Sequence, residues 1–305
     1  MSALRTGAAM ACLLGAAAAG AETHYLIVAG LGGQPDYAER FEQQASSLAA
    51  AARASVPADN VRLLSGAAAT SEAIESALQE LASATAAADS VAVFLLGHGS
   101  YDGEQYKFNV PGADLDGARF AELLEQLNAG SVLVVNATSA SGAVLEDWAG
   151  EGRTVITATR SGAERNATRF GEYWAQALAA DGADINKNGI ITAREAFDFT
   201  ERSVADSYDE EGALATEHPQ LSGDGAERFA AARLVPRAVA TPAQRELTAQ
   251  LEALEEQIAE LRERRDALPE DEYLNQLQTL LVELATTRRA LDEQTQTDGE
   301  SAANQ

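Results

Sequence analysis

Two short apolar runs stand out in the hydrophobic pattern of this chain, at residues 90–96 and 131–135. Neither run alternates with polar residues, and each ends abruptly in small and polar ones. A run of this kind predicts a β-strand that is covered on both faces, as in a parallel sheet between layers of helices. Further strands are expected at 24–29, 61–64 and 153–158, and helices between them at 35–54, 70–87, 118–127 and 168–180. The alternation predicts a three-layer α/β/α fold with a mainly parallel sheet.

Chemistry-bearing side chains follow both runs. His98 stands between Gly97 and Gly99 just after the first run, and the turn from Asn136 to Ser141 follows the second. Ligands and catalytic groups of open α/β sheets lie beyond the carboxyl ends of the strands. We therefore expect a site where these two segments meet, with residues 100–117 as a long loop beside it.

The charge of the chain is strongly acidic, with 47 Asp and Glu against 22 Lys and Arg and a net charge of −25. Binding of nucleic acid or of anionic lipid requires a basic face, so this composition argues against both classes of partner. It is compatible with an exported protein and with binding of a divalent cation.

Residues 1–21 have the features of a secretory signal: Arg5, an apolar Ala/Leu-rich run and the small residues Ala19-Gly20-Ala21. We expect cleavage near Ala21 and a secreted or periplasmic protein; loss of Arg5 changes the net charge from −25 to −26. The run is too short to span a bilayer, and no later segment is longer without charges, so the protein is not expected to span a membrane. Cys12 is the one cysteine. The mature chain then has no disulfide, no thiolate metal site and no cysteine nucleophile.

The most specific motif is a twelve-residue stretch, 184–195, that matches the calcium loop of an EF-hand. Oxygen-bearing side chains occupy loop positions 1, 3, 5, 9 and 12, glycine occupies position 6, and position 7 offers a backbone carbonyl. The predicted Ca²⁺ ligands are Asp184, Asn186, Asn188, Ile190, Thr192 and Glu195. Helices are expected on both sides, at 168–180 and 193–208. Only two ligands are charged, which predicts modest affinity, and the alternative is a helix-loop-helix that holds no ion.

The C-terminal part has a heptad pattern interrupted by Pro269. Apolar residues recur at intervals of three and four on both sides of this proline, which predicts an antiparallel helical hairpin. Such a hairpin buries its seam incompletely, so we expect it to dock on the main domain or to mediate self-association. The expected organisation is a signal peptide at 1–21, an α/β domain at 22–180, an EF-hand-containing extension at 181–235, a linker at 236–242, the hairpin at 243–292 and a disordered tail at 293–305.

The strand ends resemble the caspase and legumain clan of cysteine peptidases, over about residues 23–180. Gly97-His98-Gly99 is similar to the clan's histidine motif, and 136–142 takes the place of the turn that carries its cysteine. The resemblance implies a caspase-like α/β/α fold. It also places Thr138 where the clan has its nucleophile. A hydroxyl is far less acidic than a thiol and needs a well-placed base to react.

Three functions are open at this point. The first is a non-catalytic caspase-like module that binds a peptide or protein across the strand ends. The second is an active hydrolase in which His98 acts with Thr138, Ser139 or Ser141, and in which Asp102 or Asp114 orients the imidazole. The third is a Ca²⁺-dependent structural assembly protein built around the hairpin. His218 is expected on a surface loop.

Overall fold

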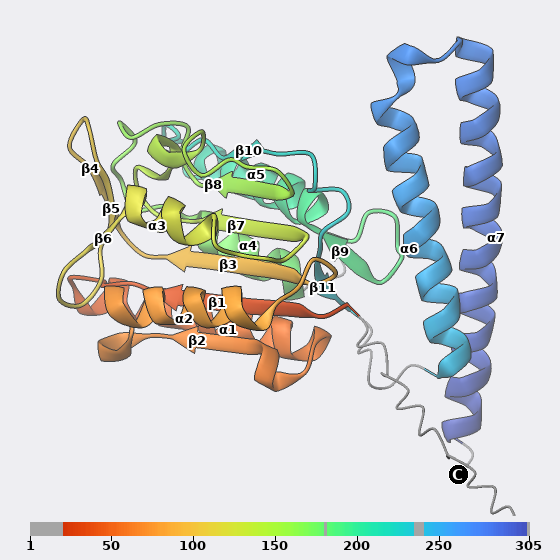
Figure 1. Ribbon diagram of the computed structural model, residues 1–305, viewed down its shortest axis with the longest axis horizontal. Helices are drawn as coiled ribbons and strands as arrows, with labels where there is room; N and C mark the ends of the chain where they lie inside the picture. Colours follow the sequence, from red (N-terminus) through yellow and green to blue (C-terminus); the bar gives the residue numbers. More distant parts are fainter. Residues whose placement is uncertain (1–20, 180–181, 235–240, 304–305) are drawn as a thin grey trace, which may run out of the picture.

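The computed structural model describes residues 21–179, 182–234 and 241–303. The predicted signal peptide, except for Ala21, lies outside these residues, as does most of the predicted linker. Figure 1 shows a layered α/β body with a long helical hairpin beside it.

The body is built on a six-stranded sheet with the order β10-β8-β7-β3-β1-β2. All neighbouring pairs are parallel except the edge pair of β10 with β8. The sheet comprises β1 (Thr23–Ala29), β2 (Val61–Leu64), β3 (Ser90–Leu96), β7 (Ser131–Asn136), β8 (Arg153–Thr157) and β10 (Gln220–Ser222). The two apolar runs form the adjacent strands β3 and β7, paired from Ser90↔Ser131 to Leu95↔Asn136. Their carboxyl ends therefore lie side by side, as the sequence predicts.

Helices cover both faces of the sheet. One face carries α1 (Pro35–Ser55), α4 (Phe170–Ala179) and α5 (Ala193–Glu210), and the other carries α2 (Ser71–Ala84) and α3 (Gly117–Leu124) (Figure 1). Each face buries its own apolar cluster, and alternate residues of β3 contribute to the two clusters. This arrangement confirms the predicted fold class. Short 3-10 turns occupy Ala58–Asn60, Gly66–Ala68, Ser141–Val144 and Arg265–Ala267.

The segment after His98 is more ordered than the loop that the sequence predicts. It forms a small antiparallel sheet of β4 (Gly99–Tyr101), β5 (Tyr106–Phe108) and β6 (Leu115–Asp116). Tyr106 and Phe108 are buried in the cluster under α2 and α3. Burying these rings takes their backbone out of water, and pairing of the strands supplies the hydrogen bonds that water no longer provides.

The extension from residue 182 packs back onto the body. It contributes β10 to the main sheet and α5 to one helical layer, while β9 (Ile190–Thr192) pairs with β11 (Ala230–Arg233). Ile191, Phe197 and Phe229 belong to the same buried cluster as the residues of α1 and α4. The extension and the α/β domain thus share one core.

The hairpin consists of α6 (Pro242–Glu263) and α7 (Glu270–Ala303). Its predicted seam is buried at Leu251, Leu254, Ile258 and Leu261. The second helix continues to Ala303, through much of the segment predicted to be disordered. Among the described residues, the helices are all too short or too polar to cross a membrane.

The hairpin lies beyond the amino end of β3, whereas the small sheet of β4, β5 and β6, which follows His98 in the chain, lies beyond its carboxyl end (Figure 1). A cavity of about 790 Å³ separates α6 from the amino ends of the strands; its lining includes Thr23, Ser90 and Ser131 from the sheet and Ala249 and Ala253 from the helix. The hairpin therefore cannot cover the carboxyl ends of the strands.

Candidate functional site

The His98 imidazole is held by aromatic rings of α1. It meets Tyr37 edge-on at 4.9 Å between centroids and Phe41 at 5.1 Å. The Arg40 guanidinium lies over the Tyr37 ring, 4.9 Å from its centroid. Partial burial lowers the pKa of His98; a hydrogen bond with the Gly32 backbone works in the opposite direction, and the charge of Arg40 adds to the lowering. His98 is therefore a neutral imidazole at neutral pH.

Thr138 is fully buried, and its hydroxyl is already occupied. The Asn136 side-chain amide donates to the Tyr106 hydroxyl (3.1 Å), and Thr138 donates to Asn136 Oδ1 (2.8 Å). Because the Thr138 proton is used in this way, Thr138 Oγ1 accepts from the Tyr106 hydroxyl, 2.6 Å away. Burial raises the pKa of Tyr106 to about 12, so its hydroxyl stays protonated and remains a donor. We call this arrangement the Asn136–Tyr106–Thr138 ring. It satisfies each of the three side chains without a contribution from His98.

The two serines of the turn differ from each other. Ser141 is fully buried, and its Oγ accepts from the Thr159 backbone N–H and lies 3.2 Å from Thr159 Oγ1. Ser139 is 1% exposed, and its Oγ has no hydrogen-bond partner among the described residues. Ser139 is thus the candidate hydroxyl of this turn that remains unengaged.

The structure brings the two halves of the candidate site together through backbone. A methyl group placed on Gly99 would lie 2.3 Å from the Ser139 carbonyl oxygen and 2.6 Å from Thr138 Oγ1, so a side chain there would clash. The side chains themselves are held from opposite faces of the sheet: His98 by α1, and Thr138 by Tyr106 from the α2–α3 cluster. Within the described residues, no hydrogen bond joins the His98 ring to Thr138, Ser139 or Ser141.

The acidic residues considered as partners of His98 serve other groups. Asp102 accepts from the backbone N–H groups of Glu104 and Gln105, which closes its own turn. Asp114 accepts from the Asn109 side chain and from the Val110 backbone. Both carboxylates stabilise the small sheet after His98.

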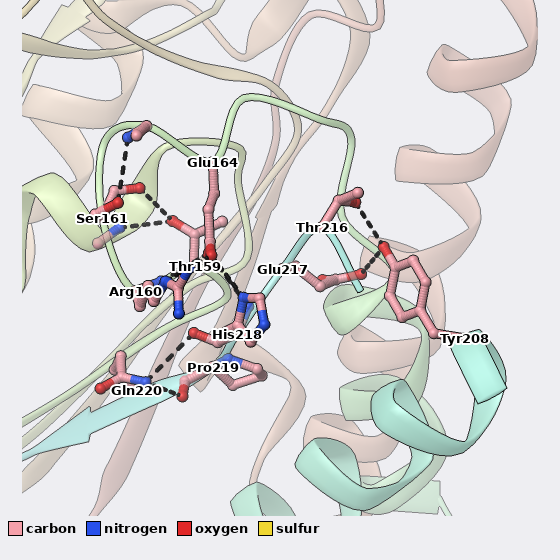
Figure 2. A network of polar contacts seen from close by, with 12 residues as sticks. Thr159, Arg160, Ser161, Glu164, Tyr208, Thr216, Glu217, His218, Pro219 and Gln220 are labelled. Atoms are coloured by element: carbon pink, nitrogen blue, oxygen red, sulfur yellow. Dashed lines mark hydrogen bonds and ion pairs between the residues drawn. The ribbon is translucent and has the colours of Figure 1, made fainter. Parts of the chain in front are cut away.

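Sequence reasoning missed an imidazole–carboxylate pair on the other side of the turn. Figure 2 shows His218 against Glu164, with Nδ1 and Oε1 2.6 Å apart. The other Glu164 oxygen accepts from the backbone of Arg160 and His218, and the Glu164 carbonyl accepts from Ala140 N at 2.7 Å. Ala140 has a left-handed backbone (φ 56°), so this bond stabilises an uncommon conformation of the turn. The two partners are 54 residues apart, and no local pattern identifies such a pair.

Glu217 lies in the same network and is nearly completely buried (Figure 2). Its carboxylate accepts from the backbone N–H groups of Arg169 and Phe170 at the start of α4 and from the Tyr208 hydroxyl. Burial raises the pKa of Glu217, and these hydrogen bonds oppose the increase only in part. The Glu217 carboxylate therefore connects the segment before β10 to the start of α4 and to α5.

The 184–195 loop is closed by its own side chains. Asp184 accepts from Asn188 N and Gly189 N, Asn186 Oδ1 accepts from Asn188 N, and Asn188 Oδ1 accepts from Ile190 N. Gly189, at the sharp turn, has φ 74°. These contacts gather the oxygens of loop positions 1, 3 and 5 along one short stretch of backbone, which is the donor chemistry that Ca²⁺ prefers.

The last ligand position is brought back to the start of the loop. Glu195 Oε1 accepts from Ile185 N, and Glu195 Oε2 accepts from the Thr192 N–H and hydroxyl. Thr192 and Glu195 together form the capping box at the start of α5. Nowhere in the described part of the chain do three or more His, Cys, Asp or Glu side chains gather closely enough to hold a metal ion by themselves. A cation in this loop would thus depend on amide, hydroxyl and carbonyl oxygens besides Asp184 and Glu195.

Comparisons with known proteins give structural likeness only. No protein-family model and no curated protein matches the chain. Among solved structures, the chain is similar to protein GSU0716 from Geobacter sulfurreducens, with a TM-score of 0.46 and 15% identity over 67% of this chain and 92% of that one. It is also similar to the Drosophila initiator caspase Dronc, with a TM-score of 0.40 and 10% identity over 71% of this chain and 82% of that one.

Proposed function

We propose that this protein is a caspase-like scaffold that binds a peptide or protein at the carboxyl ends of its strands without cleaving it. The Asn136–Tyr106–Thr138 ring carries this proposal. The Thr138 hydroxyl donates its hydrogen bond to Asn136 and is fully buried. It contacts Tyr106 of the α2–α3 cluster, whereas the His98 ring contacts Phe41 of the cluster on the opposite face. A nucleophile of this kind needs a base within hydrogen-bonding reach, and a fold by itself implies no activity.

Selection from a phage-displayed peptide library tests this function. We expect the full chain to enrich peptides that bind without being cut, as judged by mass spectrometry, and that bind His98→Ala at least tenfold more weakly. His24→Ala, at the far end of the sheet, is the control and should bind as the wild type does. Cleavage of enriched peptides, or binding indifferent to His98, would overturn the proposal.

A second candidate is a hydrolase that uses Ser139, because the Ser139 Oγ is the one candidate hydroxyl of the turn without a partner in the described residues. The neutral imidazole of His98 is in the protonation state that a general base requires. A fluorophosphonate probe would then label Ser139, and Ser139→Ala or His98→Ala would abolish labelling while Ser141→Ala would retain it. An unlabelled wild-type chain rules this candidate out.

We further propose that the 184–195 loop binds Ca²⁺. Its spacing and its buried side-chain oxygens support this, since Asp184, Asn188 and Glu195 are all at most 9% exposed. Two charged ligands correspond to the weaker end of the EF-hand range, where extracellular modules bind at roughly 10⁻⁴–10⁻³ M. Export, as proposed from residues 1–21, would place the loop where calcium is that concentrated.

Calorimetry and thermal unfolding test the calcium site. We expect Ca²⁺ to raise the Tm of the wild type, by a stabilisation of about 2.7 kcal/mol at 100 times Kd. Glu195→Gln should abolish the increase in Tm with Ca²⁺. Glu201→Gln is the control, because it removes the same charge at an exposed position of α5 and should retain the increase. A wild-type Tm and a calorimetric trace that do not respond to Ca²⁺ contradict the assignment.

A further inference from the structure

The hairpin contacts the 184–195 loop with both of its helices. From α6, the Glu255 carboxylate lies 2.5 Å and 2.6 Å from Asn188 Nδ2 and 3.4 Å from Asn186 Nδ2. From α7, Arg288 Nη1 donates to the backbone carbonyls of Asn186 and Lys187. Figure 1 shows the hairpin standing beside this end of the body.

These contacts fall on two ligand positions of the loop. A carboxylate only accepts hydrogen bonds, so Glu255 must face the N–H₂ end of each amide. The Oδ1 atoms of Asn186 and Asn188 are then directed away from Glu255, into the turn of the loop, where they accept from its backbone. Glu255 thereby fixes the amide orientation that presents oxygen to a cation.

The contact of Glu255 with Asn188 helps to hold the hairpin against the body. A cavity of about 790 Å³ separates α6 from the strand ends, so this helix does not pack directly on the sheet. The ion pair of Arg262 with Glu227, which also joins the hairpin to the body, is 3.7 Å long and exposed on both sides. Exposed ion pairs contribute little to stability. The contacts of Glu255 and Arg288 with the 184–195 loop are therefore the stronger of the described polar contacts that hold the hairpin, and a change in the strength of the Glu255 contact should alter how firmly the hairpin is docked.

Resting on the calcium site proposed above, we propose that the hairpin is part of that site. Glu255 is a positioning residue that holds the Asn186 and Asn188 amide oxygens toward bound Ca²⁺, and its negative charge is attracted by the cation. Ca²⁺ binding and hairpin docking then strengthen each other, because coupling between two binding equilibria is reciprocal.

Calorimetric titration of the full chain with Ca²⁺ tests the positioning role. Outer partners that orient metal ligands are typically worth about 10–100-fold in affinity. Glu255→Ala is expected to weaken Ca²⁺ binding at least tenfold. Glu255→Gln still offers an oxygen to Asn188 and should recover part of the loss. Glu260→Ala, an exposed glutamate on the same helix, should bind as the wild type does.

Hydrogen–deuterium exchange tests the coupling and separates it from a general loss of structure. Ca²⁺ should slow exchange of the 251–261 segment in the wild type and in Glu260→Ala, and have no effect on it in Glu255→Ala. Wild-type affinity in Glu255→Ala would overturn this inference and leave the loop as a calcium site. A wild type that binds no Ca²⁺ would overturn the calcium site itself.

Discussion

The Tyr106 hydroxyl lies 2.6 Å from Thr138 Oγ1, although the two residues are 32 positions apart and Tyr106 belongs to the small sheet rather than the main one. Tyr106 is carried by β5, and its ring packs edge-on against Trp148. The contact engages the hydroxyl of Thr138, the residue that the sequence resemblance predicts at the nucleophile position. The small sheet after His98 therefore supplies the hydrogen-bond partner that engages the Thr138 hydroxyl.

Removing that donor should destabilise the protein. Tyr106→Phe leaves the Asn136 amide without its acceptor and Thr138 without its donor, both fully buried. Leaving buried polar groups unsatisfied costs about 1–3 kcal/mol, which urea unfolding would measure as a lower free energy of unfolding. Tyr101→Phe is the control, because the Tyr101 hydroxyl donates to the solvent-exposed carbonyl of Gly103. An equal loss of unfolding free energy in Tyr106→Phe and Tyr101→Phe would contradict the Asn136–Tyr106–Thr138 ring.

A thiol introduced at Thr138 should be unreactive in the folded protein. In a Cys12→Ser background, Thr138→Cys would place its sulfur in the buried space between Tyr106 and Asn136, and a buried thiol is inert. We expect iodoacetamide to modify the Thr138→Cys variant only after unfolding, and no peptidase activity to appear. Ser100→Cys, at an exposed position near the site, should react in the folded state. Rapid modification of the folded Thr138→Cys variant would show that the turn opens, against this prediction.

The close approach of Gly99 to the turn predicts a steric penalty. The Cβ of Gly99→Ala would lie 2.6 Å from Thr138 Oγ1 and 2.3 Å from the Ser139 carbonyl, so the turn or β4 must move. Overpacking of this kind costs typically about 1–3 kcal/mol. Gly182→Ala has only an ordinary contact, 3.6 Å from the Phe199 ring, and should be nearly neutral. Urea unfolding measures the free energy of unfolding of both variants. A Gly99→Ala variant as stable as the wild type would contradict the predicted clash.

Much of the fold could be predicted from local pattern. The runs at 90–96 and 131–135 predict buried strands, and the structure places them in β3 and β7, next to each other in a parallel pair. The heptad intervals around Pro269 likewise predict α6 and α7. These elements carry their signal in their own sequence, because their apolar positions repeat with the period of the structure they form.

The missed features depend on partners that are distant in sequence. β10 is three residues long and is defined only by pairing with β8, and the strands of 99–116 only by pairing with one another. The Glu164–His218 pair joins residues 54 positions apart, and the Tyr106–Thr138 contact joins residues 32 positions apart. Such contacts are created by the fold, so periodicity of a single segment cannot predict them.

Glu217 predicts a decrease in stability as the pH rises. Burial raises its pKa in the folded state, so above the ordinary glutamate pKa the unfolded chain releases the proton while the folded chain still holds it. The free energy of unfolding therefore falls through this window and levels off above the folded pKa. Relative to Glu217→Gln, which does not titrate, the wild type should be most stable below the ordinary glutamate pKa of about 4.3 and less stable at neutral pH. A pH-independent difference in urea unfolding would contradict the raised pKa.

His98 predicts the opposite slope at higher pH. Partial burial and the nearby Arg40 charge lower its folded pKa, so as the pH drops below about 6.5 the unfolded chain takes up the proton first and stability falls. One of the three histidine signals in an NMR titration should have a midpoint below 6.5 and disappear in His98→Gln. That signal should persist in His24→Gln. His98→Gln should also lose part of the acid destabilisation seen in urea unfolding. A His98 midpoint at or above about 6.5 would contradict the lowered pKa that burial against Tyr37 and Phe41 predicts.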